Sequence, residues 1–378
     1  MTGAMYAAVA GLKTHMSALN VVGNNVANVN THAYKAASYT FAEEIYTTSK
    51  GGSDGTNVTG GTNPAQIGFG CSMGSIDVDM TSKNFAATGQ PLDVCIDGEG
   101  FLMVGDKGLV FRDLDEVSQL NLTRHGRLKF DAQGYLTDMS GNVVYGWINV
   151  KKENTATDDP NADPNDLAAQ SEPCPALTGI RLPMMDQYGN VYLPRVVDGQ
   201  LVDASNENIA AENGDTLPDG VNAEDLKLQR VVLDSISVDK NGSITGTTKG
   251  TGQVVTVGYI AIGQVDNPNG VTHIDGRYYK AMDGAGRLSV TALKEAVKNS
   301  DAFNGADGAN DQDRVDGEVQ IINGGKTELM GGGLESSGTD LAMEITNMIL
   351  MQRGYQANTR IITVTDSMLE ELVNMKRG

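Results

Sequence analysis

Residues 340–378, DLAMEITNMILMQRGYQANTRIITVTDSMLEELVNMKRG, carry the pattern that decides the fold. Apolar or aromatic side chains recur there at intervals of seven residues, at Leu341, Met348, Tyr355, Ile362 and Leu369. Ile345 and Val373 each stand four residues after one of these positions. Such a heptad seam predicts a long α-helix that packs along another helix.

The first 30 residues contain a second seam. Its positions alternate between spacings of four and three residues, with Gly23 in the one gap, and they are Met5, Val9, Leu12, Met16, Leu19 and Val26. Apolar residues at this spacing usually mark a helix packed on its own domain. Here Gly-rich stretches separate both helices from the rest of the chain, so we expect the two helices to pair. Because a fully buried Leu or Met contributes roughly 1.5–3 kcal/mol, we also expect neighbouring copies to cover the seams, which makes them a polymerisation surface.

The first helix runs into GNNVANVNT, residues 23–31, where side-chain amides cluster at Asn24, Asn25, Asn28 and Asn30. Asn disfavours helix interiors because its side chain competes with the backbone for hydrogen bonds. It also tolerates the left-handed conformation that often ends a helix. We predict a helix stop here, with amides that hydrogen-bond between subunits. A simple helix cap followed by a polar loop is the alternative interpretation.

The middle of the chain is expected to be mainly β. Short β-forming runs alternate with Gly and Asn or Asp turns, as in FDAQGYLTDMSGNVVYGW (130–147) and VTVGYIAIGQV (255–265). Residues 153–225 hold fifteen Asp and Glu against two Arg, which indicates an exposed acidic insert, and 299–318 resembles another acidic surface loop. The Gly-rich stretches 49–63 and 322–333 are expected to be linkers or an extended arm.

Charge and targeting signals narrow the function classes. The net charge of −20 argues against nucleic acid or an anionic membrane as a partner, because both would repel the chain. No run of roughly 18 apolar residues is present, so we expect no membrane insertion. The apolar run AMYAAVAGL lacks a basic segment before it and ends before Lys13, so we expect no cleaved signal peptide.

The sequence offers no motif for catalysis, a cofactor or a metal. The three cysteines, Cys71, Cys95 and Cys174, are scattered without the spacing of a disulfide framework or a zinc site. GFGCSMG, residues 68–74, lacks the strand–turn–helix context of a nucleotide-binding loop. None of the histidines stands in a catalytic neighbourhood; they are His15, His32, His125 and His273. We therefore predict that the chain is not an enzyme and uses no cofactor or metal.

The acidic stretches invite one test for calcium. An EF-hand loop that began at Asp159 would place Pro164 where Gly is required and Gln170 where the closing Glu is required. A loop that began at Asp307 would place Ala309 at a ligand position. A secreted calcium-dependent adhesin would explain an acidic β-rich middle, but it would leave both terminal helices unexplained.

Several segments resemble the flagellar rod and hook protein family, and its hook subunits most closely. LNVVGNNVANVNTHAYKA (19–36) is similar to that family's N-terminal signature, and residues 334–376 are similar to its closing helix. Internal similarity lies in four further segments: 62–70, 88–104, 123–147 and 252–279. The acidic insert and the loop 299–318 depart from the pattern.

The resemblance implies a mainly β fold with α-helical termini, in which the two terminal helices pair like a coiled coil and two β-domains lie outward. It implies this division: an inner helical polymerisation domain (1–30 and 340–378), connecting arms (31–73 and 322–339), a β-domain (74–147 and 250–321) and an acidic outer β-domain (148–249).

The same resemblance implies a structural subunit of the flagellar hook, a curved flexible tube that carries torque from rod to filament. Its partners would be further copies of itself, rod proteins, the hook cap, hook–filament junction proteins and the flagellar export apparatus. It would be exported to the extracellular hook without a cleaved signal peptide. A distal rod subunit, which shares both terminal patterns, is the alternative.

Overall fold

The computed structural model describes residues 2–55, 60–107, 109–111, 114–151, 171–174, 176–185, 191–193, 195–197, 200–202, 229–249, 252–293, 320–321 and 327–376. The chain divides into two compact units, Met1–Asp79 with Ser337–Gly378, and Met80–Ser336. Most of the predicted acidic insert, the loop 299–318 and both tested calcium loops lie outside the described residues.

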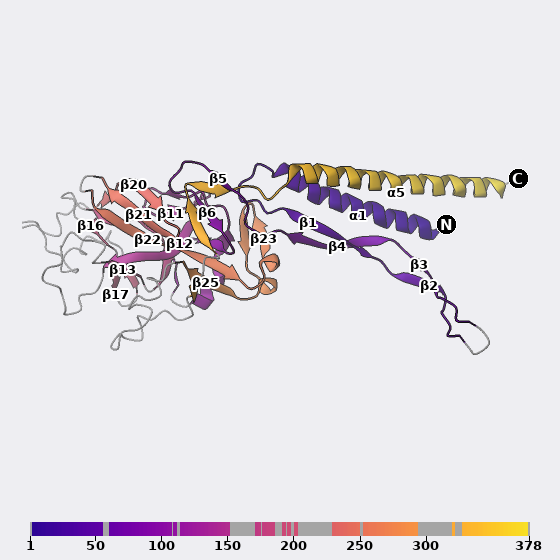
Figure 1. The fold of residues 1–378 in the computed structure, drawn as a ribbon, viewed down its shortest axis with the longest axis horizontal. Helices are drawn as coiled ribbons and strands as arrows, with labels where there is room; N and C mark the ends of the chain where they lie inside the picture. Colours follow the sequence, from indigo (N-terminus) through magenta and orange to yellow (C-terminus); the bar gives the residue numbers. More distant parts are fainter. Residues whose placement is uncertain are drawn as a thin grey trace, which may run out of the picture. The chain divides into compact units, whose positions relative to one another are not determined.

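The first unit contains the two long helices, α1 (Thr2–Ala27) and α5 (Leu341–Met375). They lie side by side in opposite directions, so the N-terminus and the C-terminus share one end of the pair (Figure 1). Asp340 caps α5, because its carboxylate accepts hydrogen bonds from the backbone N–H groups of Ala342 (2.9 Å) and Met343 (3.2 Å). The prediction of paired terminal helices is confirmed.

Two antiparallel strand pairs complete the first unit. β1 (Ala37–Glu43) pairs with β4 (Cys71–Val78), and β2 (Tyr46–Lys50) pairs with β3 (Ala65–Gly68). The stretch 49–63, which we expected to be a linker or an arm, begins with the last two residues of β2 and includes a bridge between Ser53 and Thr62. In its described part, this stretch is therefore the connection of a β-hairpin.

The second unit is built on a 15-stranded sheet. Its main path runs in the order β10 (Lys129–Phe130), β11 (Leu136–Thr137), β12 (Val143–Lys151), β22 (Val254–Val265), β7 (Phe101–Gly105), β9 (Asn121–Thr123), β24 (Tyr278–Lys280) and β23 (Thr272–Asp275). Branches from it are β8 (Val110–Phe111), β13 (Ser171–Pro173), β14 (Leu177–Gly179), β20 (Leu233–Val238), β21 (Ser243–Thr248), β25 (Leu288–Ala292) and β26 (Gln320–Ile321). The described pairings are antiparallel apart from β25 with β26.

Smaller sheets and single turns surround it. β5 (Phe85–Ala87) pairs with β28 (Gly333–Glu335), β6 (Val94–Asp97) with β27 (Glu328–Gly331), and β17 (Arg195–Val197) with β18 (Gln200–Val202). A three-stranded sheet contains β16 (Val191–Tyr192), β15 (Met184–Met185) and β19 (Gln229–Arg230). The 3₁₀ turns are η1 (Leu114–Gln119), η3 (Pro268–Gly270) and η4 (Asp283–Ala285).

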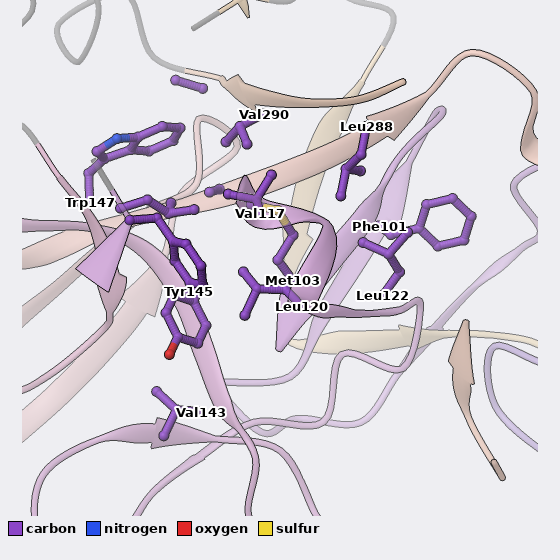
Figure 2. Close-up of a cluster of buried hydrophobic side chains, with 14 of the residues drawn as sticks. Phe101, Met103, Val117, Leu120, Leu122, Val143, Tyr145, Trp147, Leu288 and Val290 are labelled. Carbon is purple, nitrogen blue, oxygen red and sulfur yellow. The ribbon is translucent and has the colours of Figure 1, made fainter. Parts of the chain in front are cut away.

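Three apolar clusters form the described core of the second unit, and two of them are large. The first gathers Phe101 and Met103 with the fully buried Tyr145 and Trp147 and with residues of β9, η1 and β25 (Figure 2). The second contains Leu102 and Val104, whose side chains alternate with those of Phe101 and Met103 along β7. Strand β7 is thus buried on both faces. The predicted fold class, mainly β with helical termini, is confirmed.

Residues 327–335 differ from the expected linker at 322–339. Leu329 and Leu334 are 0% and 1% exposed, and their strands β27 and β28 belong to the second unit. A Cβ atom at Gly333 would lie 2.4 Å from Cζ of Phe85. Here glycine permits close packing of two strands, whereas its frequency in the sequence suggested flexibility.

Candidate interaction surface

The buried face of α1 is a stripe of small residues. It consists of Ala8, Gly11, Thr14, Ala18, Val22 and Asn25. A Cβ at Gly11 would lie 2.7 Å from Nδ2 of Asn358, so the absence of a side chain allows α5 to approach closely. Thr14 donates its hydroxyl hydrogen to the carbonyl of Cys71 on β4, at 2.9 Å. This stripe therefore makes contacts within the chain.

The predicted seam of α1 lies beside that stripe and not in it. Val9 and Met16 are 37% and 53% exposed. The remaining seam positions are half-buried: Met5, Leu12, Leu19 and Val26. The heptad reasoning selected the large apolar side chains, but the paired helices use the small ones. The large side chains are left at the surface of the unit.

The seam of α5 is divided. Met348, Tyr355 and Ile362 are half-buried, whereas Leu341, Ile345 and Leu369 are 43%, 45% and 36% exposed. Further exposed apolar residues on this helix are Met343, Ile349, Leu350, Ile361, Val364, Met368, Leu372, Val373 and Met375. A helix this apolar on several sides is suited to contacts on more than one face.

His15 is held at the middle of the helix pair. Its Nδ1 lies 3.3 Å from Sδ of Met351, and its ring meets that of Phe41 edge-on at 5.6 Å between centroids. A Cβ at Gly354 would lie 2.7 Å from Cε1 of His15. Gly354 thus leaves the space that the imidazole fills, and His15 has a packing role.

Asn25 is 1% exposed and makes four hydrogen bonds within the unit. Its amide donates to the carbonyl of Ala37 (2.8 Å) and to Oε1 of Glu344 (3.0 Å). Its oxygen accepts from the Tyr34 hydroxyl and from the N–H of Ala37, both at 3.0 Å. Asn25 therefore joins the end of α1, the start of β1 and the first turn of α5.

The other amides behave in different ways. Asn24 donates to the Tyr34 hydroxyl at 3.1 Å, and Asn28 donates to the carbonyl of Asn24 at 2.9 Å. Asn30 is exposed. The helix ends at Ala27 as predicted, but the left-handed residue after it is Ala33 (φ 59°) rather than an Asn. The predicted bonds between subunits remain open for Asn30, whereas Asn24, Asn25 and Asn28 already bond inside the chain.

The carboxylate of Glu344 lies beside the hydrogen bonds of Asn25. Oε1 accepts the Asn25 amide, while Oε2 is buried without a hydrogen-bond partner among the described residues. Burial first, and the negative charge of Glu344 second, raise the pKa of Tyr34 and of Tyr39 above the ordinary value. Both phenols therefore stay neutral at physiological pH.

The strands of the first unit add apolar surface that our sequence reasoning missed. Ile45 and Ile67 are 82% and 61% exposed on the β2–β3 hairpin, and Phe41 and Ile76 are 44% and 54% exposed on β1 and β4. The Gly, Ser and Thr content of the neighbouring segment hid these residues, although the β-forming run YTFAEEIYTT was a usable signal. An isolated two-stranded hairpin is marginal in water, so such a surface favours a partner.

Comparison with known proteins identifies both helical segments. Residues 5–35 match the family model described as flagella basal body rod protein. Residues 330–375 match the model described as flagellar basal body rod FlgEFG protein C-terminal. The chain belongs to the flagellar rod and hook protein family.

Full-length relatives in this family carry both kinds of name. The chain is 26% identical to the flagellar basal-body rod protein FlgG of Bacillus subtilis, over 100% of both chains. It is 26% identical to the flagellar hook protein FlgE of Borreliella burgdorferi, also over 100% of both. It is 23% identical to the hook protein FlgE of Salmonella typhimurium, over 98% of this chain and 99% of the other.

A solved structure of the hook protein FlgE2 of Helicobacter pylori superposes with a TM-score of 0.34. It is 10% identical and covers 66% of this chain and 100% of the other. At that score it is no guide to the fold.

The other histidines and the cysteines that the sequence offered as candidates lie in surroundings that indicate structural roles. His125 is buried, and the ring of His273 meets that of Tyr279 edge-on at 5.0 Å between centroids. Cys95 and Cys174 are buried and Cys71 is half-buried, and no disulfide joins them. Among the described residues, no three His, Cys, Asp or Glu side chains gather as a metal site. The described helices are not apolar enough over a sufficient length to span a membrane.

Proposed function

We propose that this chain is a structural subunit of the flagellar hook, and that copies of it polymerise into a curved tube that transmits torque. Hook proteins FlgE of several bacteria are among its full-length relatives. The segments that match the family models are the two helices with their flanking residues.

The observation that carries the proposal is the apolar surface of the first unit. On α5 alone, Met343 (62% exposed), Leu350 (56%) and Val373 (56%) face solvent. On the hairpin, Ile45 is 82% exposed. Extensive exposed apolar surface of this kind favours contact with another protein. A chain that offers such surface on helices and strands together can contact several neighbours, as a subunit of a tube must.

The location and the partners follow from the same proposal. The subunit is carried by the flagellar export apparatus without a cleaved signal peptide, and it assembles beneath the hook cap onto the rod. Hook–filament junction proteins bind the finished tube.

A rod subunit is the second candidate. The observation in its favour is the match to the Bacillus subtilis rod protein FlgG over the full length of both chains. The two candidates differ in the shape of the polymer that they would form, because a hook is curved and a rod is straight.

Electron microscopy of the purified chain under precipitating salt tests the proposal. Curved or supercoiled tubes are expected; straight short rods would favour the rod subunit, and the absence of any polymer would contradict both. The matched variant is a triple substitution to Ala of three exposed or half-buried seam residues on α5: Leu341, Met348 and Leu369. It should lose polymerisation while the β-rich second unit stays folded. Tubes formed by this variant would refute the role of the seam.

A further inference from the structure

The C-terminal end of α5 extends beyond α1. Asn25 meets Glu344, His15 meets Gly354 and Gly11 meets Asn358, so each step back along α1 is one step forward along α5. At this register Thr2, the first residue of α1, lies level with residue 367. Residues 368–375 therefore form an overhang of about 12 Å at 1.5 Å per residue.

This overhang is apolar and uncovered. Met368, Leu372 and Met375 are 49%, 41% and 73% exposed, and they recur at the spacing that places them on one face. With Glu371 and Asn374 they line an open cavity of about 650 Å³. The overhang contains Glu370 and Glu371 and no basic residue.

A face of α1 has the complementary chemistry. Tyr6, Val9 and Met16 are 69%, 37% and 53% exposed, and Lys13 is exposed between them. Lys13 is the only Lys, Arg, Asp or Glu in α1. These four side chains form a stripe that we call the outer stripe, distinct from the small-residue stripe that packs within the chain. It is apolar with one positive charge, whereas the overhang is apolar with negative charge.

We propose that the overhang of one copy docks on the outer stripe of α1 in a second copy, with Glu371 beside Lys13. The outer stripe of the same chain is out of reach, because the overhang continues a helix that leads away from it. The two patches are unlike and lie on every copy, so the contact is heterologous and each added copy offers a new free patch. Such a contact builds an open filament when its rotation does not close into a ring. The inference rests on the proposed function, because it presupposes that the chain polymerises.

Disulfide trapping in assembled tubes tests the contact. In a Cys71→Ser background, a chain with both Val9→Cys and Leu372→Cys should form a ladder of covalent multimers under oxidant. A disulfide within one chain is excluded, because Val9 lies level with residue 360 and thus about 18 Å from Leu372, whereas disulfides join Cα atoms about 4.4–6.8 Å apart. Each single variant should stay monomeric on a denaturing gel. The matched control places the first cysteine at Val254, which is 60% exposed in the second unit, and should give no ladder.

The outcomes separate the possibilities. Dimers from Leu372→Cys alone would show that overhangs meet each other, and would overturn the proposal. So would the absence of a ladder from all four pairings of position 9 or 16 with position 368 or 372 in tubes that form normally. If the wild-type chain forms no tube at all, the proposed function itself fails, and the inference loses its basis with it.

Charge reversal gives an independent readout. Lys13→Glu and Glu371→Lys should each raise the critical concentration for assembly by about two- to fivefold, the range of a surface ion pair. The double variant should restore the wild-type value. Glu370→Lys is the matched control, since Glu370 does not line the cavity, and Lys13→Glu should not rescue it. If Glu371→Lys and Glu370→Lys change the critical concentration equally and Lys13→Glu rescues both equally, then Glu371 does not pair specifically with Lys13.

Discussion

Replacing Gly354 with Ala tests whether the two helices pair as described. Two effects of opposite sign compete at this position. Ala is favoured over Gly inside a helix by about 1 kcal/mol. Against this, the new Cβ would lie 2.7 Å from Cε1 of His15.

The imidazole of His15 has little freedom to move away. Phe41 lies against it at 5.6 Å between centroids, and Sδ of Met351 lies 3.3 Å from its Nδ1. Overpacking of this kind costs typically about 1–3 kcal/mol. The clash therefore exceeds the gain in helix propensity, and Gly354→Ala should lower the free energy of unfolding of the first unit by about 1 kcal/mol.

Two further variants isolate the contact. Gly23→Ala, at a helical site with no atom within 4 Å of the new Cβ, should raise the free energy of unfolding by about 1 kcal/mol. In a His15→Ala background, Gly354→Ala should change sign and stabilise by a similar amount. The coupling between His15 and Gly354 is then about 2 kcal/mol.

Urea unfolding followed by circular dichroism at 222 nm measures these changes. The described α-helix, 26 residues of α1 and 35 of α5, lies in the first unit, while the single tryptophan, Trp147, lies buried in the second. Fluorescence of Trp147 should therefore be unaffected by all four variants. The reasoning is refuted if Gly354→Ala stabilises the helices equally with and without His15, because the imidazole would then not occupy the space beside Gly354.

Four other substitutions are expected to have separable effects. Asn25→Ala should cost the first unit about 2–4 kcal/mol, since four hydrogen bonds are lost, whereas Asn30→Ala should change the free energy of unfolding by less than about 0.5 kcal/mol in the same urea titration. Burial raises the pKa of Tyr145 to about 12 in the folded chain. The contribution of its neutral phenol to the free energy of unfolding is therefore complete below pH 10 and is lost as the pH rises from 10 to about 12. Tyr145→Phe should remove this part of the fall in the free energy of unfolding, and an unchanged pH dependence would contradict the assignment. Gly126→Ala would place a Cβ 1.7 Å from the carbonyl oxygen of Val94, so the second unit should fail to fold, which Trp147 fluorescence would report.

The sequence predicted the helices, their pairing and the β-rich middle because periodicity and turn residues are local signals. It did not predict which face of α1 is buried. Heptad reasoning gives weight to large apolar residues such as Met16, whereas the buried face of α1 consists of small residues such as Gly11 and Ala18, which carry little hydrophobic signal. Two helices approach closely where one of them lacks a side chain at the point of contact. Where that point lies depends on both helices together, so the sequence of one helix does not reveal it.

The amide cluster shows a similar limit. Its composition indicated a helix stop with polar partners, and the helix does end at Ala27. The partners of Asn25 are Tyr34, Ala37 and Glu344, and the last of these is 319 positions away in the chain. Sequence spacing gives no measure of that contact, so an interaction within one chain was indistinguishable from one between subunits.

The two stripes of α1 explain how one helix can support a fold and an assembly at the same time. Small residues complete the pair with α5, so the large apolar side chains of the outer stripe remain available for a neighbour. Exposed apolar surface on every copy would also promote indiscriminate association. The net charge of −20 opposes this, because like-charged copies repel one another until salt screens the interaction to within about 8–10 Å. Under those conditions short-range contacts decide which copies stay together, and a geometry that matches Lys13 with Glu371 is selected over other apolar encounters.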